Sequence, residues 1–171
     1  MDVCQTQRLS IRQFKESDAE FIIELLNEEA FIQNINDKQV RNTSDAINYL
    51  RSGPMASYQK FGYGLYLVQL KDTNTPIGMC GFLKRDDFEY ADIGYSLLEA
   101  FWSKGYAKEA AIAVLDYAHK KHHLTTVLAA TLPSNTGSIN LLEKLGFSLK
   151  GTLEMYGEFS HLYQLTLPQN N

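Results

Sequence analysis

The chain has few cysteines, no long apolar run and no excess of basic charge, and each shortage disfavours a class of protein. Its two cysteines, Cys4 and Cys80, are too few for a disulfide framework and lack the spacing of metal ligands. No apolar stretch approaches the ~20 residues that a membrane-spanning helix needs. Lysine and arginine total 16 against 20 acidic residues, which disfavours nucleic-acid binding. We therefore expect a cytoplasmic protein with no metal and neither a membrane nor a nucleic acid as partner.

The composition fits one folded domain. Hydrophobic residues make up 44% of the 171 residues. A chain of this length buries about two-thirds of its unfolded surface. We find no internal repeat, so we expect a single domain over residues 1–171, in which Gln169 to Asn171 fray. The net charge of −4 favours a cationic substrate such as an amine.

Apolar residues that alternate or recur at helical spacing predict a mixed α/β layer fold. Strands are predicted over residues 9–12, 63–70, 77–83, 90–97, 124–131, 147–153 and 160–167. Helices are predicted from Ser17, from Thr43 to near Pro54, over residues 105–121 and from Asn135 to Gly146. A turn-forming cluster at residues 72–75 indicates that the second and third strands form an antiparallel hairpin. The helical connection between the fourth and fifth strands indicates that they are parallel.

The stretch from Ala91 to Glu109 runs from a strand through a glycine loop into a helix N-terminus. The first-turn N–H groups of a helix lack intrahelical partners, and the helix dipole adds partial positive charge there. A loop that enters the helix through Gly105 can therefore bind a phosphate group, because glycine allows a close approach or a positive φ. The alternative is that Gly105 only lets the chain turn into a surface helix.

Three segments carry a resemblance to a known family. Gly94-Tyr95-Ser96-Leu97 together with residues 102–110 resembles the acetyl-CoA segment of the GNAT N-acetyltransferase superfamily. Residues 135–147, which begin at an asparagine and end in Gly-Phe, resemble the family's downstream helix. Residues 6–12 resemble the first strand of the branch that contains the ribosomal-protein N-terminal acetyltransferases (RimJ/RimL-like).

The resemblance implies a single, mostly antiparallel sheet with flanking helices, in which the fourth and fifth strands splay apart. It implies acetyl-CoA as co-substrate, with its pantetheine arm in that opening. The implied cofactor-binding residues are Ile93, Leu97, Leu98, Ser103, Lys104, Gly105, Tyr106, Ala107, Lys108 and Asn135. The helices after the first strand form one wall of the acceptor groove in this family, so residues 34–42 either select the substrate or form a solvated loop.

Asp92 is the candidate general base. The strand period places it on the polar side of its strand, opposite the packed side that carries Ala91, Ile93 and Tyr95. The corresponding position in histone-type relatives holds a catalytic glutamate, so the shorter aspartate reaches the amine directly or through a water molecule. The alternative is that Asp92 only accepts a structural hydrogen bond, and Glu89 and Glu158 are the second choices for the base.

Ser138 is the candidate general acid. Many relatives place a tyrosine seven residues after the motif asparagine, where this chain has Leu142. In the ribosomal-protein branch a serine three residues after the asparagine serves instead, and Ser138 matches that position. The alternative is purely structural, with Asn135 as a helix N-cap and Ser138 in the first turn.

The resulting function is an N-acetyltransferase that moves an acetyl group from acetyl-CoA to a primary amine by direct attack in a ternary complex. The acceptor is a protein N-terminus or a small molecule such as a polyamine or an amino sugar. The missing tyrosine at Leu142 favours an alternative, a non-catalytic acyl-CoA-binding module. A monomer and a homodimer both fit.

Overall fold

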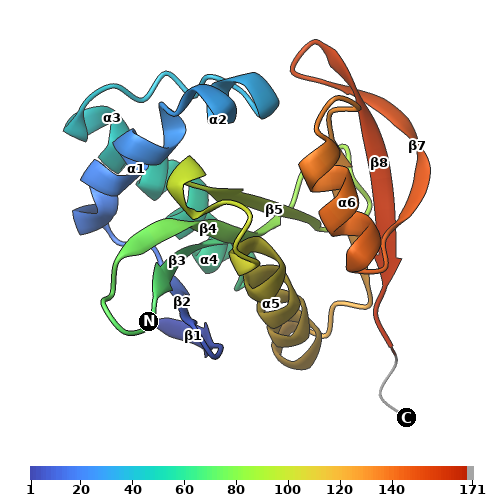
Figure 1. Ribbon diagram of the computed structural model, residues 1–171, viewed down its shortest axis with the longest axis horizontal. Coiled ribbons are helices and arrows are strands. Elements are labelled where there is room, and N and C mark those ends of the chain that lie inside the picture. The colour runs from blue at the N-terminus through green and yellow to red at the C-terminus, as the bar shows by residue number, and fades with distance from the viewer. Residues whose placement is uncertain (169–171) are drawn as a thin grey trace.

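One mixed sheet organises the protein, with strand order β1-β2-β3-β4-β5-β6-β8-β7 (Figure 1). A computed structural model describes residues 1–168, so the expected fraying of Gln169 to Asn171 lies outside the described residues. The strands are β1 (Asp2–Gln5), β2 (Leu9–Gln13), β3 (Leu65–Leu70), β4 (Pro76–Leu83), β5 (Asp92–Leu97), β6 (Thr126–Thr131), β7 (Ser148–Met155) and β8 (Glu158–Thr166). The helices are α1 (Ala19–Leu26), α2 (Glu29–Asn34), α3 (Thr43–Leu50), α4 (Ala56–Phe61), α5 (Tyr106–His122) and α6 (Thr136–Lys144).

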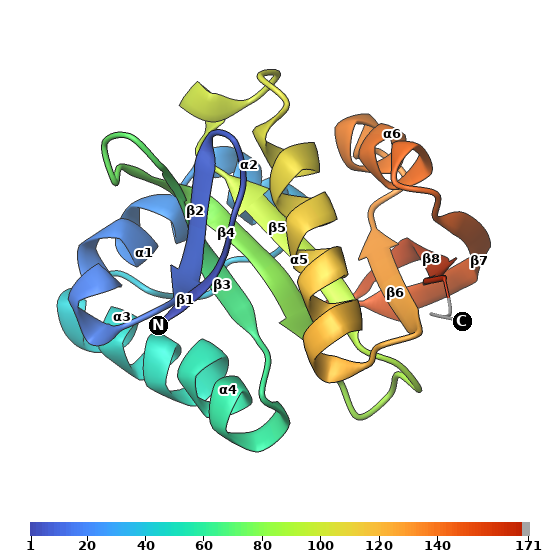
Figure 2. The same ribbon diagram turned by 90° about the horizontal axis from the view of Figure 1, so that it is seen from below.

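The sheet separates two helical layers, and its strands alternate between them because successive side chains point to opposite faces. In β3, Leu65 and Leu67 pack with buried residues of α1 and α3, whereas Tyr66 and Val68 pack with α5. Figure 2 shows α5 running across the strands, with α1, α3 and α4 grouped at the other side. The predicted mixed α/β fold is confirmed.

β5 and β6 are joined at a single place. They pair in parallel at Asp92 and Leu128, where the Leu128 amide donates to the Ala91 carbonyl at 2.9 Å. Beyond this pair β6 follows β8, with which it forms an antiparallel ladder from Thr126 to Thr131. The parallel direction and the splay are both confirmed, and β5 continues to Leu97 with one edge open.

Two elements differ from the sequence expectation. β1 was not predicted, because its four residues lack a clear apolar alternation; it forms by pairing with β2 at the sheet edge. The helix beginning at Thr43 was predicted to end near Pro54, which is wrong. A π-helical segment, Arg51–Met55, carries the chain through Pro54 into α4. The wider turn accommodates a residue that has no N–H and whose ring would clash in a regular α-helix.

Two further findings concern residues 1–168. No helix in this part of the chain is long and apolar enough to cross a membrane. No group of three histidine, cysteine or acidic side chains within it is arranged to hold a metal ion.

Candidate active site

A cleft of about 950 Å³ lies along the open edge of β5. It continues over the start of α5, past α6, and on to α2 and the turn between β7 and β8. Ten of the twelve predicted site residues line it: Asp92, Ile93, Leu97, Ser103, Gly105, Tyr106, Ala107, Lys108, Asn135 and Ser138. The other two, Leu98 and Lys104, lie outside its lining. Leu98 is buried against the α1–α3 layer, and the Lys104 ammonium lies 5.6 Å from the Phe101 ring centroid.

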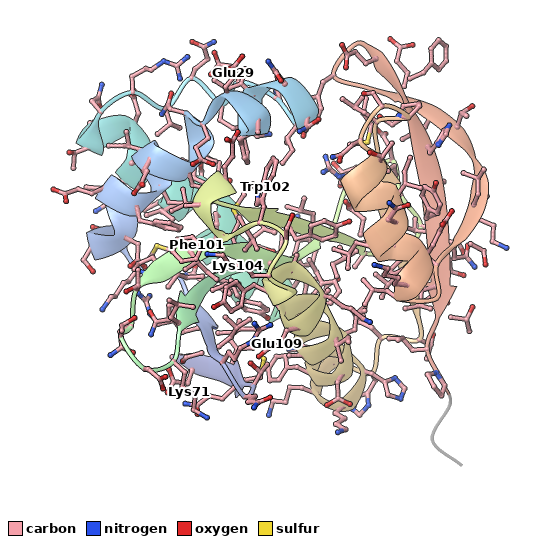
Figure 3. The ribbon with its side chains drawn as sticks, viewed as in Figure 1. Glu29, Lys71, Phe101, Trp102, Lys104 and Glu109 are labelled. Carbon is pink, nitrogen blue, oxygen red and sulfur yellow. The ribbon has the colours of Figure 1, made fainter. Side chains whose placement is uncertain are left out.

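The loop before α5 has the backbone that the glycine predicted. Gly105 is the N-cap of α5 with φ of 82°, and Ser103 has φ of 58°. The Trp102 indole Nε1 donates to the Leu97 carbonyl at 2.9 Å, which ties the loop to the end of β5. Figure 3 shows Phe101, Trp102 and Lys104 on the segment that leads into α5. The first turn of a seventeen-residue helix, whose N–H groups lack intrahelical partners, therefore lines the cleft.

The turn of the β1–β2 hairpin is hydrogen-bonded to this loop and to α5. We call these contacts, which Thr6 and Arg8 make with Glu109 and the Lys104 carbonyl, the brace, and they were not predicted from the sequence. Arg8 donates from Nε to Glu109 Oε2 at 2.7 Å and from Nη1 to the Lys104 carbonyl at 2.9 Å. The Thr6 hydroxyl and the Arg8 amide both donate to Glu109 Oε1, at 2.5 and 3.0 Å. The Arg8 guanidinium also lies 4.3 Å from the Tyr106 ring centroid. Arg8 and Glu109 are 101 residues apart, so no local pattern could reveal the pair.

Asp92 is buried beside an arginine. Its side chain is 4% exposed, and Arg85 Nε donates to both carboxylate oxygens at 3.1 and 3.3 Å. Burial raises the pKa of Asp92 to about 6, although the Arg85 charge opposes the shift. Asp92, Ile93 and Tyr95 all line the cleft, and Ile93 and Tyr95 also pack in the core under α5, as the strand period predicted. Of the second choices, Glu158 also lines the cleft and Glu89 does not.

Ser138 and Tyr95 form a hydroxyl pair across the gap. The Tyr95 phenol and Ser138 Oγ are 2.7 Å apart. Burial raises the pKa of Tyr95 to about 12, against the effect of the Ser138 hydrogen bond. Asn135 Oδ1 accepts from the Ser138 amide at 3.2 Å, so Asn135 is a helix N-cap, as the structural alternative held. The strand period assigned Tyr95 to packing, and this concealed its hydroxyl.

Comparisons with known proteins identify the family. A family model described as an acetyltransferase (GNAT) domain matches residues 8–148. The uncharacterized N-acetyltransferase p20 of Bacillus licheniformis is 28% identical, over 98% of this chain and 96% of that protein. The ribosomal protein uS5 alanine N-acetyltransferase of Escherichia coli is 29% identical, over 62% of this chain and 56% of that protein. A solved structure of RimL, a ribosomal L7/L12 alpha-N-protein acetyltransferase in complex with coenzyme A, has a TM-score of 0.85 at 18% identity, covering 98% of each chain.

The chain therefore belongs to the GNAT acetyltransferase family, and the resemblance to its ribosomal-protein branch is confirmed. The likeness to RimL at 18% identity concerns the fold.

Glu109→Gln should destabilise the protein, because it removes the charge that Arg8 and Thr6 surround. Glu109 is 18% exposed in its ion pair, so we expect a loss of about 2 kcal/mol in the free energy of unfolding. Asp116→Asn is the matched control on the same helix, since its ion pair with Lys120 is 57% exposed on the aspartate side and is worth under ~1 kcal/mol. Urea unfolding of both variants measures the difference. Equal losses would contradict the brace.

Proposed function

We propose that this protein transfers an acetyl group from acetyl-CoA to a primary amine by direct attack in a ternary complex. The observation that carries the proposal is the open edge of β5, which leads from the loop of Gly105 to the buried carboxylate of Asp92. One cleft therefore joins an anion-binding helix N-terminus to a group able to accept a proton.

The cofactor assignment rests on backbone rather than on side chains. The pyrophosphate would accept hydrogen bonds from the first-turn N–H groups of α5, with Lys108 adding charge at the same end of the helix. The pantetheine arm would lie along Ile93 to Leu97, where β6 has moved away. The Leu98 amide already donates to the Ile77 carbonyl at 2.9 Å. Because neither Leu98 nor Lys104 lines the cleft, these two residues are the weakest of the predicted contacts.

The chemistry needs a neutral amine and a proton for the thiolate. Asp92 takes a proton from the ammonium group, the amine nitrogen then attacks the thioester carbonyl, and a C–N bond forms as the C–S bond breaks. The thiolate receives a proton from Ser138, whose hydroxyl is paired with Tyr95 at 2.7 Å. The nitrogen loses its second proton as the amide forms, this proton restores the Ser138 hydroxyl, and Asp92 releases its own proton to water. The products are an amide, free coenzyme A and one proton, and no other reactant is required.

The pKa of Asp92 favours an α-amine over a lysine side chain. Proton transfer to a base with a pKa of about 6 is uphill by about 2.7 kcal/mol from an amine of pKa ~8. The same transfer is uphill by about 6 kcal/mol from a lysine amine of pKa ~10.4. The relative named for acetylation of an alanine of uS5 supports the same preference.

We further propose that residues 1–171 act as one N-acetyltransferase domain, in the cytoplasm, as a monomer or a homodimer. Two free cysteines, Cys4 and Cys80, suit a reducing compartment.

Gly105→Ala should weaken coenzyme A binding at least about tenfold, the equivalent of one lost charge-assisted hydrogen bond. An alanine is strained at φ of 82°, and its Cβ would lie 3.3 Å from Arg8 Nη2, so the phosphate-facing N–H groups would shift. Gly62→Ala is the matched control, with φ of 80° and a Cβ 3.3 Å from His122. Titration calorimetry should find normal binding in the control, and coenzyme A but not ATP or NAD should raise the melting temperature. Normal binding by the Gly105 variant would contradict the cofactor assignment.

Asp92→Asn should lower kcat by about a hundredfold to ten-thousandfold, with coenzyme A affinity unchanged. The carboxylate must be ionised to accept a proton, so the wild-type kcat should fall below pH about 6 and the variant should lose this limb. Stopped acetylation assays over pH 5–9 on an α-amine panel provide the test, with Asp72→Asn as a surface control. Should coenzyme A bind while no amine is acetylated, the alternative of a non-catalytic acyl-CoA-binding module would replace this proposal.

A further inference from the structure

The turn between β7 and β8 places a tyrosine in an unusual backbone conformation. Tyr156 has φ of 51° and Gly157 has φ of 78°, and these two residues link Met155 to Glu158. Two-residue hairpin turns with both φ positive favour Asn-Gly or Gly-Gly, because a bulky side chain is strained there. Strain of this kind gathers at functional sites. Figure 1 shows this hairpin rising beside α6 with its tip toward α2.

Two cations from other segments converge on the Tyr156 hydroxyl. Lys38 Nζ, from the segment after α2, and Arg85 Nη1, from the segment after β4, each lie 3.3 Å from the phenol oxygen. Lys38 also lies 4.8 Å from the Tyr156 ring centroid. Burial alone would raise the pKa of Tyr156, but these two cations lower it. All three side chains line the cleft beside Asp92.

This cluster has more donors than acceptors. Among residues 1–168, Lys38 forms no ion pair with a carboxylate, and the adjacent Asp37 pairs with Arg41 at 2.6 Å. Arg85 uses its Nε on Asp92, and its Nη1 has only the phenol oxygen as a hydrogen-bond partner in that part of the chain. The ammonium, the guanidinium and the phenol thus present donors around a single shared oxygen.

The charge of the cleft differs from that of the chain. The protein has a net charge of −4, from which a cationic substrate was expected. The described cleft has six cationic side chains and only two carboxylates: Lys38, Lys60, Lys84, Arg85, Lys108 and Lys144 against Asp92 and Glu158. Lys108 lies at the α5 end. At the other end the charges of Arg85 and Lys84 act on Asp92, and Lys38 contacts Tyr156, which Arg85 also contacts. An acceptor with several ammonium groups, such as a polyamine, would meet repulsion there.

We propose that the acceptor is a primary amine with a carboxylate a few bonds from its nitrogen, and that Lys38, Arg85 and Tyr156 bind this carboxylate. The inference rests on the proposed N-acetyltransferase function and names its substrate class. The amine would face Asp92 and the thioester, while the carboxylate replaces the shared phenol oxygen as acceptor for the two cations. Arg85 then contacts both the base and the substrate, which fixes the distance between amine and carboxylate.

Matched acceptor pairs test this substrate class. Acetylation of glycylglycine is compared with that of glycylglycine amide, and a Ser-Asp-Ala-Ala peptide with Ser-Asn-Ala-Ala, so that every acceptor of both pairs carries an α-amine. Spermidine is the polycation. The first pair represents small acceptors and the second acidic protein N-termini. In one or both pairs, the carboxylated acceptor should have a kcat/KM at least about tenfold higher, because a charge-assisted hydrogen bond contributes ~1.5–3 kcal/mol.

Variants separate binding from structure. Lys38→Gln should raise KM for the carboxylated acceptor about tenfold with kcat unchanged, and should leave the amide acceptor and acetyl-CoA unaffected. Tyr156→Phe should raise the same KM, and Lys38→Glu should reverse the preference toward spermidine. Lys71→Gln, whose ammonium donates to the Thr6 carbonyl at 3.2 Å, is a control of equal charge and should behave as wild type.

The outcomes distinguish the two proposals. Acetylation that is indifferent to the carboxylate, or a Lys38→Gln variant with unchanged KM in both pairs, overturns the substrate class and leaves the N-acetyltransferase function standing. If no amine is acetylated, the function proposal fails. Calorimetry on the coenzyme A-loaded protein then still tests the subsite: no binding of glycylglycine or of the acidic peptide overturns it, and binding that Lys38→Gln abolishes supports it.

Discussion

The separation of β5 from β6 is the constraint on which the rest of the molecule depends. A sheet normally satisfies the backbone groups of an inner strand from both sides, and here β5 has a β6 partner only at Asp92. Along the rest of this edge the backbone N–H and C=O groups of β5 need water or a ligand as hydrogen-bond partners. The protein therefore forms fewer hydrogen bonds between strands here and exposes a surface that a ligand can bind. The antiparallel ladder of β6 with β8 compensates on the far side, and the Tyr95–Ser138 hydroxyl pair bridges the gap itself. The brace of Arg8 on Glu109 keeps the α5 loop at the open end of the gap.

Much of this fold could be predicted because its signals are local. The seven expected strands, the hairpin of β3 and β4 and the long helix α5 each follow from apolar spacing and turn residues. Gly105 could be identified from the sequence because glycine is the residue that most readily adopts the positive φ found before this helix. The alternation of β5 also placed Ile93 in the core under α5 correctly, although Ile93 and Asp92 both line the cleft. The splay had no signal in the composition and came from family resemblance.

The missed features depend on residues that are distant in sequence. Arg8 and Glu109 meet only because the β1–β2 hairpin packs beside α5, and Tyr156 meets Lys38 across 118 residues. Proline commonly ends a helix, but here Pro54 lies within the π-helical segment Arg51–Met55, and the chain continues into α4. The net charge does not describe the cleft, because it averages over the whole surface, whereas a substrate meets the few side chains that line the cleft.

Hydrogen–deuterium exchange with and without coenzyme A tests most directly whether the gap between β5 and β6 holds the cofactor. The backbone segments 93–97 and 103–108 follow the proposed path of the cofactor. A ligand bound at the open edge would protect their amides from exchange with solvent. The account predicts slower exchange in these two segments at saturating coenzyme A, with β1 and β7 unchanged. Saturable coenzyme A binding that protects other segments and leaves these two unaltered would contradict it.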